Sequence, residues 1–183
     1  MSKAPAVSFS HLGMFVRDID AMADFYKRYL GLLETDRGEL PLPGNPRIIF
    51  LSRDAREHHQ VALVAGREDG PSTINQLSFD VGSLAGLRRL HASLEERGAP
   101  MFAINHGASW SVYTYDPEGN MLEIYVHSPF YVPQPVVDPL DLSQSDEDIV
   151  RTTEAAYKDR PGFQTMAEWS RAFARRIEAA SQS

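Results

Sequence analysis

Two segments of the chain alternate hydrophobic and polar residues in the way that half-buried strands do. They are residues 8–17, which contain SHLGMFV, and residues 74–82, which contain INQLSFDV. Each is followed by a stretch whose apolar residues recur every three or four positions, which predicts an amphipathic helix. The same strand-then-helix order therefore occurs twice along the chain.

The ends of both predicted helices carry the expected capping residues. In DIDAMADFYKRYLG, Asp18 can accept hydrogen bonds from the free amides of the first turn, and Gly31 can end the helix. In SLAGLRRLHASLEERG, Ser83 and Gly98 take the corresponding places. These boundaries support two helices of similar length.

Three shorter strand candidates follow each helix. They lie at 32–37, 46–53 and 58–65 in the first half and at 99–105, 109–115 and 119–127 in the second. Within DPEGN (116–120), Pro117 presets φ and Gly119 supplies a left-handed position, so this segment predicts a turn. The chain is thus an α+β protein with two tandem βαβββ modules, 8–66 and 74–128. GREDGPST (66–73) links them, and the repeat predicts two lobes of a cupped mixed sheet around one site.

The pattern changes after residue 128. SPFYVPQPVVDPLDL is rich in proline, and residues 144–158 and 165–181 have the periodicity of amphipathic helices. We therefore expect residues 1–128 to form one domain, with 129–183 as an extended and helical tail. The tail covers an open sheet edge, caps a pocket or forms a subunit contact, and the sequence leaves these alternatives open.

Strand parity places three polar side chains on matching faces. Leu12, Met14 and Val16 share one face of the first strand, which puts His11 on the other. The same reasoning puts Gln76 opposite Leu77, Phe79 and Val81, and Glu123 opposite Leu122, Ile124 and Val126. We expect His11, Gln76 and Glu123 to line the concave side, whereas a lone His or Glu on a strand is more often structural or solvated.

Composition narrows the class of protein. Hydrophobic residues make up 43% and charged residues 23%, the net charge is 18 − 25 = −7, and there is no cysteine. This excludes disulfides and thiolate ligands, and the lack of a Lys/Arg cluster argues against nucleic acid as a partner. MSKAPAVSFS lacks the apolar stretch of a signal peptide, and no apolar run is long enough to span a membrane. We expect a cytoplasmic protein.

Three stretches together resemble the vicinal oxygen chelate superfamily, which includes glyoxalases, bleomycin and fosfomycin resistance proteins and extradiol dioxygenases. They are SHLGMFVRDIDAMADFYKRYLGL, INQLSFDV and SVYTYDPEGNMLEIYV, and the likeness covers roughly residues 8–133. Within the superfamily the chain is most similar to single-domain type I extradiol dioxygenases. The resemblance implies a paired-module fold and metal-dependent cleavage of a catechol-like aromatic diol by O2.

The resemblance also implies a metal site. Such enzymes hold Fe(II), or Mn(II) in some cases, with two His and one carboxylate. His11 takes the place of the first His, Glu123 that of the carboxylate, and Gln76 stands where the second His is expected. Gln can bind a metal through its amide oxygen, which is a harder donor than imidazole nitrogen. Glyoxalase-like members have a further ligand where this chain has Ala62.

Three more residues follow the dioxygenase pattern. His59, with His58 as the adjacent alternative, corresponds to an acid–base His, and His106 and Tyr113 correspond to residues that bracket substrate and oxygen. Each also has a structural interpretation, as an exposed pair, a turn residue or a strand aromatic. Five aromatic residues are candidates for a ring-accepting wall, with a place in the core as the alternative for as many of them: Phe15, Trp110, Tyr115, Phe130 and Tyr131.

Two other functions remain open at this stage. One is a metal-dependent isomerase or lyase that needs no oxygen, and the other is a non-catalytic small-molecule-binding protein of the resistance type. The isomerase is disfavoured because Ala62 cannot act as a metal ligand. The binding protein is disfavoured because sequestering a ligand would not require His59, His106 and Tyr113. Expected partners are a small aromatic substrate and O2, and the resemblance implies a homo-oligomer.

Overall fold

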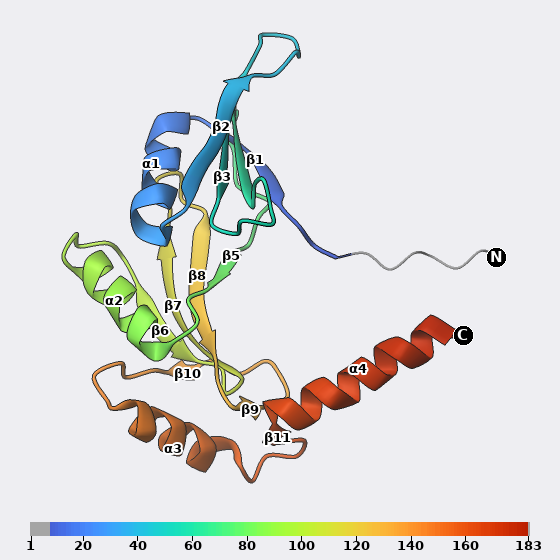
Figure 1. Cartoon of the computed structure of the whole chain (residues 1–183). Coiled ribbons are helices and arrows are strands. Elements are labelled where there is room, and N and C mark those ends of the chain that lie inside the picture. Colours follow the sequence, from blue (N-terminus) through green and yellow to red (C-terminus); the bar gives the residue numbers. More distant parts are fainter. Residues whose placement is uncertain (1–7, 183) are drawn as a thin grey trace. The chain divides into compact units, whose positions relative to one another are not determined.

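The computed structural model describes residues 8–182, and Figure 1 shows its helices and strands. Residues 1–7, on which the predicted lack of a signal peptide depends, lie outside the described residues. Contacts divide the chain into two compact units. The first holds the residues up to Thr73 together with Asp116–Asn120, and the second holds Ile74–Tyr115 and the residues from Met121 onward.

The described part of the first unit forms one βαβββ module. Its four-stranded sheet has the order β1-β4-β3-β2, and α1 packs against β3 and β4. The elements are β1 (Leu12–Val16), α1 (Ile19–Leu30), β2 (Leu33–Glu39), β3 (Arg47–Ser52) and β4 (Val61–Ala65).

The second unit repeats this order and adds the tail. Its main sheet has the order β10-β6-β7-β8-β5, and α2 packs against β7 and β8. The module consists of β5 (Leu77–Asp80), α2 (Leu84–Glu95), β6 (Phe102–Asn105), β7 (Ser109–Tyr115) and β8 (Met121–His127). The tail consists of β9 (Phe130–Tyr131), β10 (Asp138–Pro139), α3 (Asp146–Tyr157), β11 (Gln164–Thr165) and α4 (Met166–Gln182). The prediction of two βαβββ modules with a C-terminal helical extension is confirmed.

Matching registers relate the two modules. In each, the first strand runs parallel to the last, whereas the other pairs of the module are antiparallel. His11 immediately precedes β1 as Gln76 immediately precedes β5. Ala62 pairs with Gly13, and Glu123 pairs with Ser78 at the corresponding step. Ala62 is therefore the first-module counterpart of Glu123.

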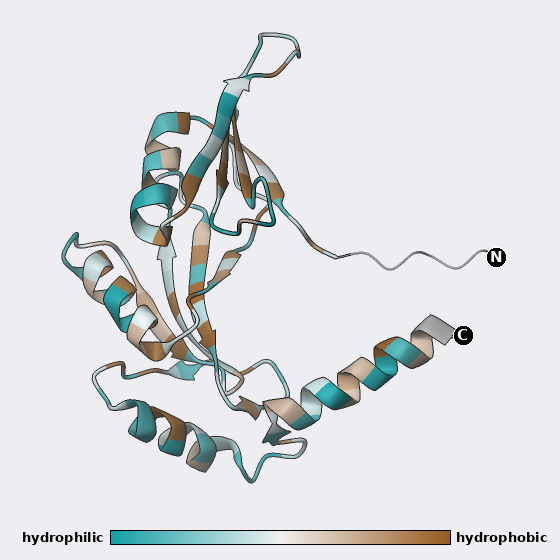
Figure 2. Cartoon of the chain, in the orientation of Figure 1, coloured by the Kyte–Doolittle hydropathy of each residue, from teal (hydrophilic) through white to brown (hydrophobic). Residues whose placement is uncertain are grey.

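Burial explains why these segments fold as predicted. Met14 and Val16 of β1 are buried, and so are Leu122, Ile124 and Val126 of β8, which confirms the apolar faces assigned from strand parity. Figure 2 shows hydrophobic colour concentrated in the strands and alternating with polar colour around the helices. No helix among residues 8–182 is both long and apolar enough to cross a membrane.

Three of the four predicted helix caps are present, whereas α2 ends at Glu95 with Glu96 as its C-cap, before the predicted Gly98. The Asp18 side chain accepts a hydrogen bond from the Ala21 amide at 3.0 Å, and Ser83 accepts one from the Gly86 amide at 3.1 Å. Gly31 ends α1 in the left-handed conformation with φ of 65°. A side chain with a Cβ is strained at such a φ, so the sequence stop signal has a direct physical cause.

The tail covers an edge of the second sheet. β10 pairs with β6, and the Thr153 hydroxyl of α3 accepts hydrogen bonds from Asn105 and Trp110. Trp110 is therefore a core residue, which was the alternative for these aromatic residues, and it does not belong to a substrate wall. Phe130 is also buried, against Phe163, so the same conclusion applies to it.

The turn at 116–120 groups with the first unit because of Glu118. Its carboxylate accepts hydrogen bonds from the amides of Arg17 and Asp18, just before α1, and pairs with the Arg67 guanidinium at 3.1 Å. The Glu118 side chain is only 5% exposed. A buried carboxylate at a helix N-terminus is favoured by the helix dipole and by the free amides there.

Replacing Glu118 by Ala should therefore destabilise the protein. The change removes the ion-pair partner of Arg67 and the acceptor of two backbone amides, so we expect a loss of roughly 2–3 kcal/mol in the free energy of unfolding. Urea denaturation followed by circular dichroism measures it. Asp24→Ala, which removes an exposed ion pair with Lys27, is the matched control and should change stability by less than about 1 kcal/mol. Equal losses in the two variants would contradict this role of Glu118.

Candidate functional site

A buried carboxylate, Glu123, lies at the centre of a polar cluster in the second unit. Its strand, β8, runs between β7 and β5, and Glu123 is 9% exposed. Tyr113 on β7 and Ser78 on β5 are its direct partners in register. Strand pairing alone therefore brings one polar side chain from each neighbouring strand to this carboxylate.

Four donors surround the two oxygens of Glu123. Oε2 accepts from Ser78 Oγ at 2.6 Å and from Gln76 Nε2 at 2.8 Å. Oε1 accepts from Ser111 Oγ and from Tyr113 OH, both at 2.8 Å. A buried carboxylate needs such partners to replace the water that it has lost.

His106 continues this network. Its Nδ1 lies 2.6 Å from the Val136 carbonyl oxygen, and its Nε2 lies 2.9 Å from Tyr113 OH. A carbonyl can only accept, so Nδ1 carries a proton, and Nε2 meets the Tyr113 hydroxyl. The single phenolic proton of Tyr113 is donated to Glu123, and the phenolic oxygen also lies next to His106. His106, Tyr113 and Glu123 form a hydrogen-bonded row along which a proton can move.

The environment of Tyr113 keeps its phenol protonated. Burial raises the Tyr113 pKa above its ordinary value, and the hydrogen bond to Glu123 and the charge of Glu123 raise it further. Phe102 stacks on the same ring, with centroids 5.0 Å apart. Tyr113 is therefore a positioned hydrogen-bond donor at neutral pH.

The first unit holds a separate cluster of histidines. The rings of His11 and His59 lie 4.2 Å apart, and His58 contacts His59 while its Nε2 lies 2.9 Å from Asp36. Burial lowers the His59 pKa, and the neighbouring His11 and His58 lower it further. His59 therefore favours the neutral form, which can accept a proton. Of the adjacent pair, His59 is the one that packs against His11.

The six predicted site residues thus fall into two groups. Gln76, His106, Tyr113 and Glu123 are joined by hydrogen bonds in the second unit, whereas His11 and His59 meet in the first. Sequence reasoning missed Ser78 and Ser111 as partners of Glu123. Strand parity could have predicted both serines. Ser78 lies on the same strand face as Gln76, and Ser111 lies two residues from Tyr113 on the same strand and therefore on the same face.

The orientation of Gln76 bears on whether these residues suit a metal. Its amide nitrogen faces Glu123 and Ser78, an assignment that follows from their hydrogen bonds. Carboxylate, amide oxygen and imidazole are all ligands of divalent cations, so the donor types fit. The Gln76 amide must turn about its last torsion to present oxygen instead of nitrogen, and this torsion is soft. Among residues 8–182, no group of three or more His, Asp or Glu side chains suited to a metal is found.

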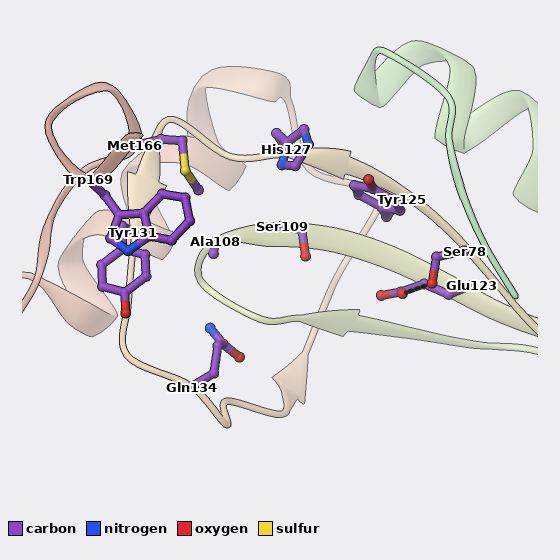
Figure 3. A pocket seen from close by; sticks show the side chains of 10 residues that line it. All are labelled: Ser78, Ala108, Ser109, Glu123, Tyr125, His127, Tyr131, Gln134, Met166 and Trp169. Atoms are coloured by element: carbon purple, nitrogen blue, oxygen red, sulfur yellow. Dashed lines mark hydrogen bonds between the residues drawn. The ribbon is translucent and has the colours of Figure 1, made fainter. Parts of the chain in front are cut away.

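A pocket of about 450 Å³ lies along the same face of β8. Figure 3 shows Ser78 and Glu123 toward one end and Tyr131, Met166 and Trp169 toward the other. The last two belong to α4, so the tail lines the pocket as well as covering a sheet edge. Of the predicted aromatic wall, Tyr131 lines this pocket.

The protein has the vicinal oxygen chelate fold. It consists of two βαβββ modules, in each of which the first and last strands pair in parallel, and the last strand of the second module carries a polar cluster. The model of the Glyoxalase/Bleomycin resistance protein/Dioxygenase superfamily matches residues 8–124, more than half of the chain. The chain belongs to this superfamily.

Two curated relatives share the name of one activity. Biphenyl-2,3-diol 1,2-dioxygenase 3 of Rhodococcus globerulus is 32% identical over 102 residues, which cover 51% of this chain and 53% of that protein. Biphenyl-2,3-diol 1,2-dioxygenase 2 of the same organism is 27% identical over 125 residues, which cover 64% of this chain and 62% of that protein. The chain thus spans between about half and two thirds of the length of these relatives.

Solved structures share the fold at lower identity. A glyoxylase/bleomycin resistance protein/dioxygenase domain from a Frankia species aligns with a TM-score of 0.57 at 21% identity, over 67% of this chain and 99% of that one. The fosfomycin resistance protein FosX from Listeria monocytogenes, in complex with Mn(II) and sulfate, aligns with a TM-score of 0.54 at 16% identity, over 68% and 95%. At these identities the likeness shows the fold alone.

Removing one donor from Glu123 should cost stability. Ser111 is fully buried, so Ser111→Ala leaves Oε1 with an unmet acceptor site and should lower the free energy of unfolding by about 1–3 kcal/mol. Ser109→Ala, on the same strand, is the control and should be nearly neutral. Urea denaturation compares the two, and a Ser111→Ala protein as stable as the control would rule out this role.

Replacing His11 by Ala should raise the His59 pKa toward its ordinary value. The change removes the neighbouring imidazole, whose positive charge disfavours protonation of His59. Titration of the imidazole Cε1 protons by NMR measures the shift. His91→Ala on α2 should leave the His59 pKa where it is. A lower or unchanged His59 pKa in His11→Ala would show that the two rings are not coupled.

Proposed function

We propose that the protein is a metal-dependent extradiol dioxygenase, which cleaves a catechol-like aromatic diol with O2. The observation that carries the proposal is the hydrogen-bonded row of His106, Tyr113 and Glu123. The family pattern requires a His, a Tyr and a carboxylate of this kind in the second module. The names of the two Rhodococcus relatives support the same reaction.

The proposed ligands are His11, Gln76 and Glu123, with Fe(II) as the metal and Mn(II) as the second choice. When bound, such an ion supplies Lewis acidity toward the diol oxygens and electrons toward O2. Gln76 gives the site an oxygen donor where imidazole nitrogen is expected. An amide oxygen is a harder and weaker donor than an imidazole nitrogen. We therefore expect this site to retain Fe(II) less strongly than a site with two His ligands.

His59 is proposed as the residue that takes a proton from the diol. Its lowered pKa keeps the imidazole neutral near pH 7, which is the state that a general base requires. The same ring, once protonated, can return the proton to an oxygen of the reacting diol. His58, which is held by Asp36, is less suited to this role.

Tyr113 and His106 are proposed to stabilise negative charge that develops on oxygen during cleavage. Tyr113 keeps its proton because its pKa is raised, so it can donate a hydrogen bond to an oxyanion. His106 Nε2, which meets the Tyr113 hydroxyl, is placed to take up a proton there and to return it. The hydrogen bond of Nδ1 to Val136 fixes the ring for this exchange.

A second candidate, a non-catalytic small-molecule-binding protein, is favoured by one observation. Glu123 already accepts four hydrogen bonds, one of them from the neutral Gln76 amide, so its charge has partners without a cation. The remaining alternative, an isomerase or lyase, is disfavoured because Ala62 provides no ligand at the counterpart of Glu123.

Oxygen uptake tests the proposed reaction. Protein loaded anaerobically with Fe(II) is mixed with air-saturated catechols and hydroquinones, and an oxygen electrode and absorbance spectra follow the reaction. We expect uptake with a new yellow chromophore in the native protein, its loss in His11→Ala and its retention in the control His91→Ala.

The Gln76→His variant distinguishes two explanations for low activity: weak binding of the metal, and a protein that is not a catalyst. This variant should retain more iron after gel filtration, measured by metal analysis, because imidazole replaces the amide. Uptake only in Gln76→His would mean that the chemistry is lost in the native chain. Absence of uptake in every variant would refute the dioxygenase and leave the binding protein as the better account.

A further inference from the structure

We propose that the pocket beside Glu123 takes an aromatic diol of two rings and that helix α4 sets this size. The diol ring lies at the Glu123 end, and the second ring lies against Tyr131, Met166 and Trp169. The inference rests on the proposed function for the position of the diol. It goes beyond that function by making the tail a specificity element.

The length of the pocket follows from strand geometry. Glu123, Tyr125 and His127 alternate along β8 and all line the pocket. Glu123 and His127 are four residues apart, which is about 13 Å along a strand at roughly 3.3 Å per residue. Tyr131 and Trp169 lie toward the far end in Figure 3. The pocket is therefore elongated, with its acidic group at one end.

Its volume is larger than one ring needs. A cavity of about 150 Å³ can hold a benzene molecule, whereas this pocket measures about 450 Å³. A single catechol bound at Glu123 would leave most of the apolar end filled with water. A second ring would displace that water from Met166 and the aromatic side chains, which is favourable.

Stacked rings and backbone hydrogen bonds tie the far wall to its neighbours. Tyr131 stacks on Trp169 with ring centroids 5.1 Å apart, and Trp169 stacks on Phe173 at 5.2 Å. β9 pairs with β11 just before α4, and the Met166 amide donates to the Pro129 carbonyl at 2.8 Å. Because the rings of this wall already contact one another, a ligand ring that packs on them binds without the entropic cost of ordering the wall.

The start of α4 is fixed as well. Thr165 Oγ1 accepts from the Glu168 amide at 3.2 Å, and Glu168 accepts in return from the Thr165 amide at 3.0 Å. This reciprocal pair is a capping box. It fixes the first turn of α4, which carries both Met166 and Trp169.

Charge argues that the second ring is neutral. None of the ten lining residues is Lys or Arg, and Glu123 adds a carboxylate. A carboxylate or sulfonate on the distal ring would find no permanent cation among these residues, since His127 is positively charged only when it is protonated. The pocket therefore fits an uncharged second ring.

Equilibrium binding tests the inference without relying on turnover. Anaerobic calorimetry measures the affinities of two probes, catechol and biphenyl-2,3-diol, for the native protein. We expect biphenyl-2,3-diol to bind roughly tenfold more tightly or better, because the second ring buries apolar surface. Trp169→Ala should bring the two affinities close together by weakening only the larger probe.

Two further variants guard against indirect effects. Ala108→Leu narrows the pocket from the turn before β7 and should also weaken the larger probe selectively. Ile177→Ala, on the exposed part of α4, should leave both affinities unchanged. Equal binding of the two probes, no binding of either, or equal losses of both in Trp169→Ala would overturn the inference.

Oxygen uptake distinguishes this inference from the proposed function. Selective binding of biphenyl-2,3-diol without uptake would refute the dioxygenase but leave the two-ring pocket in place. Uptake with catechol and biphenyl-2,3-diol at equal kcat/KM, unchanged in Trp169→Ala, would support the dioxygenase and overturn the role of α4.

Discussion

The polar face of the second unit depends on one constraint, the burial of the Glu123 carboxylate. A carboxylate that is 9% exposed must find partners within the protein. Ser78 and Tyr113 reach it because β5 and β7 flank β8 in register, and Ser111 reaches it from the same strand as Tyr113. This demand fixes the direction of the Tyr113 hydroxyl and, through it, the contact with His106. The candidate chemistry is thus a consequence of how one charge is accommodated.

Gln76 is one of the residues that supply a hydrogen bond to the buried Glu123 carboxylate. It stands at the step of the repeat where the first module has His11, and it presents a nitrogen donor to Glu123. In the proposed metal site, a divalent ion bound to Glu123 would replace this NH2 group as the partner of the carboxylate. Turning the amide would convert Gln76 from a competitor of the metal into its ligand. The proposed metal site requires the Gln76 amide to turn, whereas the alternative of a metal-independent binding protein requires no such change.

Much of this arrangement could be predicted from the sequence, because periodicity and repetition are local signals. The modules, the caps at Asp18 and Ser83 and the faces of β1 and β8 follow from patterns within a few residues. The direction of the Gln76 amide does not, because it is set by a partner 47 residues away. The choice between wall and core for Trp110 stayed open for a similar reason, since its burial depends on Thr153 of α3. The pocket wall of Met166 and Trp169 depends on packing of the tail, for which the sequence left three alternatives open.

Diffraction from crystals grown with Mn(II), recorded at the manganese absorption edge, tests the account most directly. The account predicts an anomalous peak bound by Glu123, with the Gln76 amide turned so that its oxygen faces the ion. An ordered Gln76 whose nitrogen still donates to Glu123, with no peak beside the carboxylate at saturating Mn(II), would contradict it.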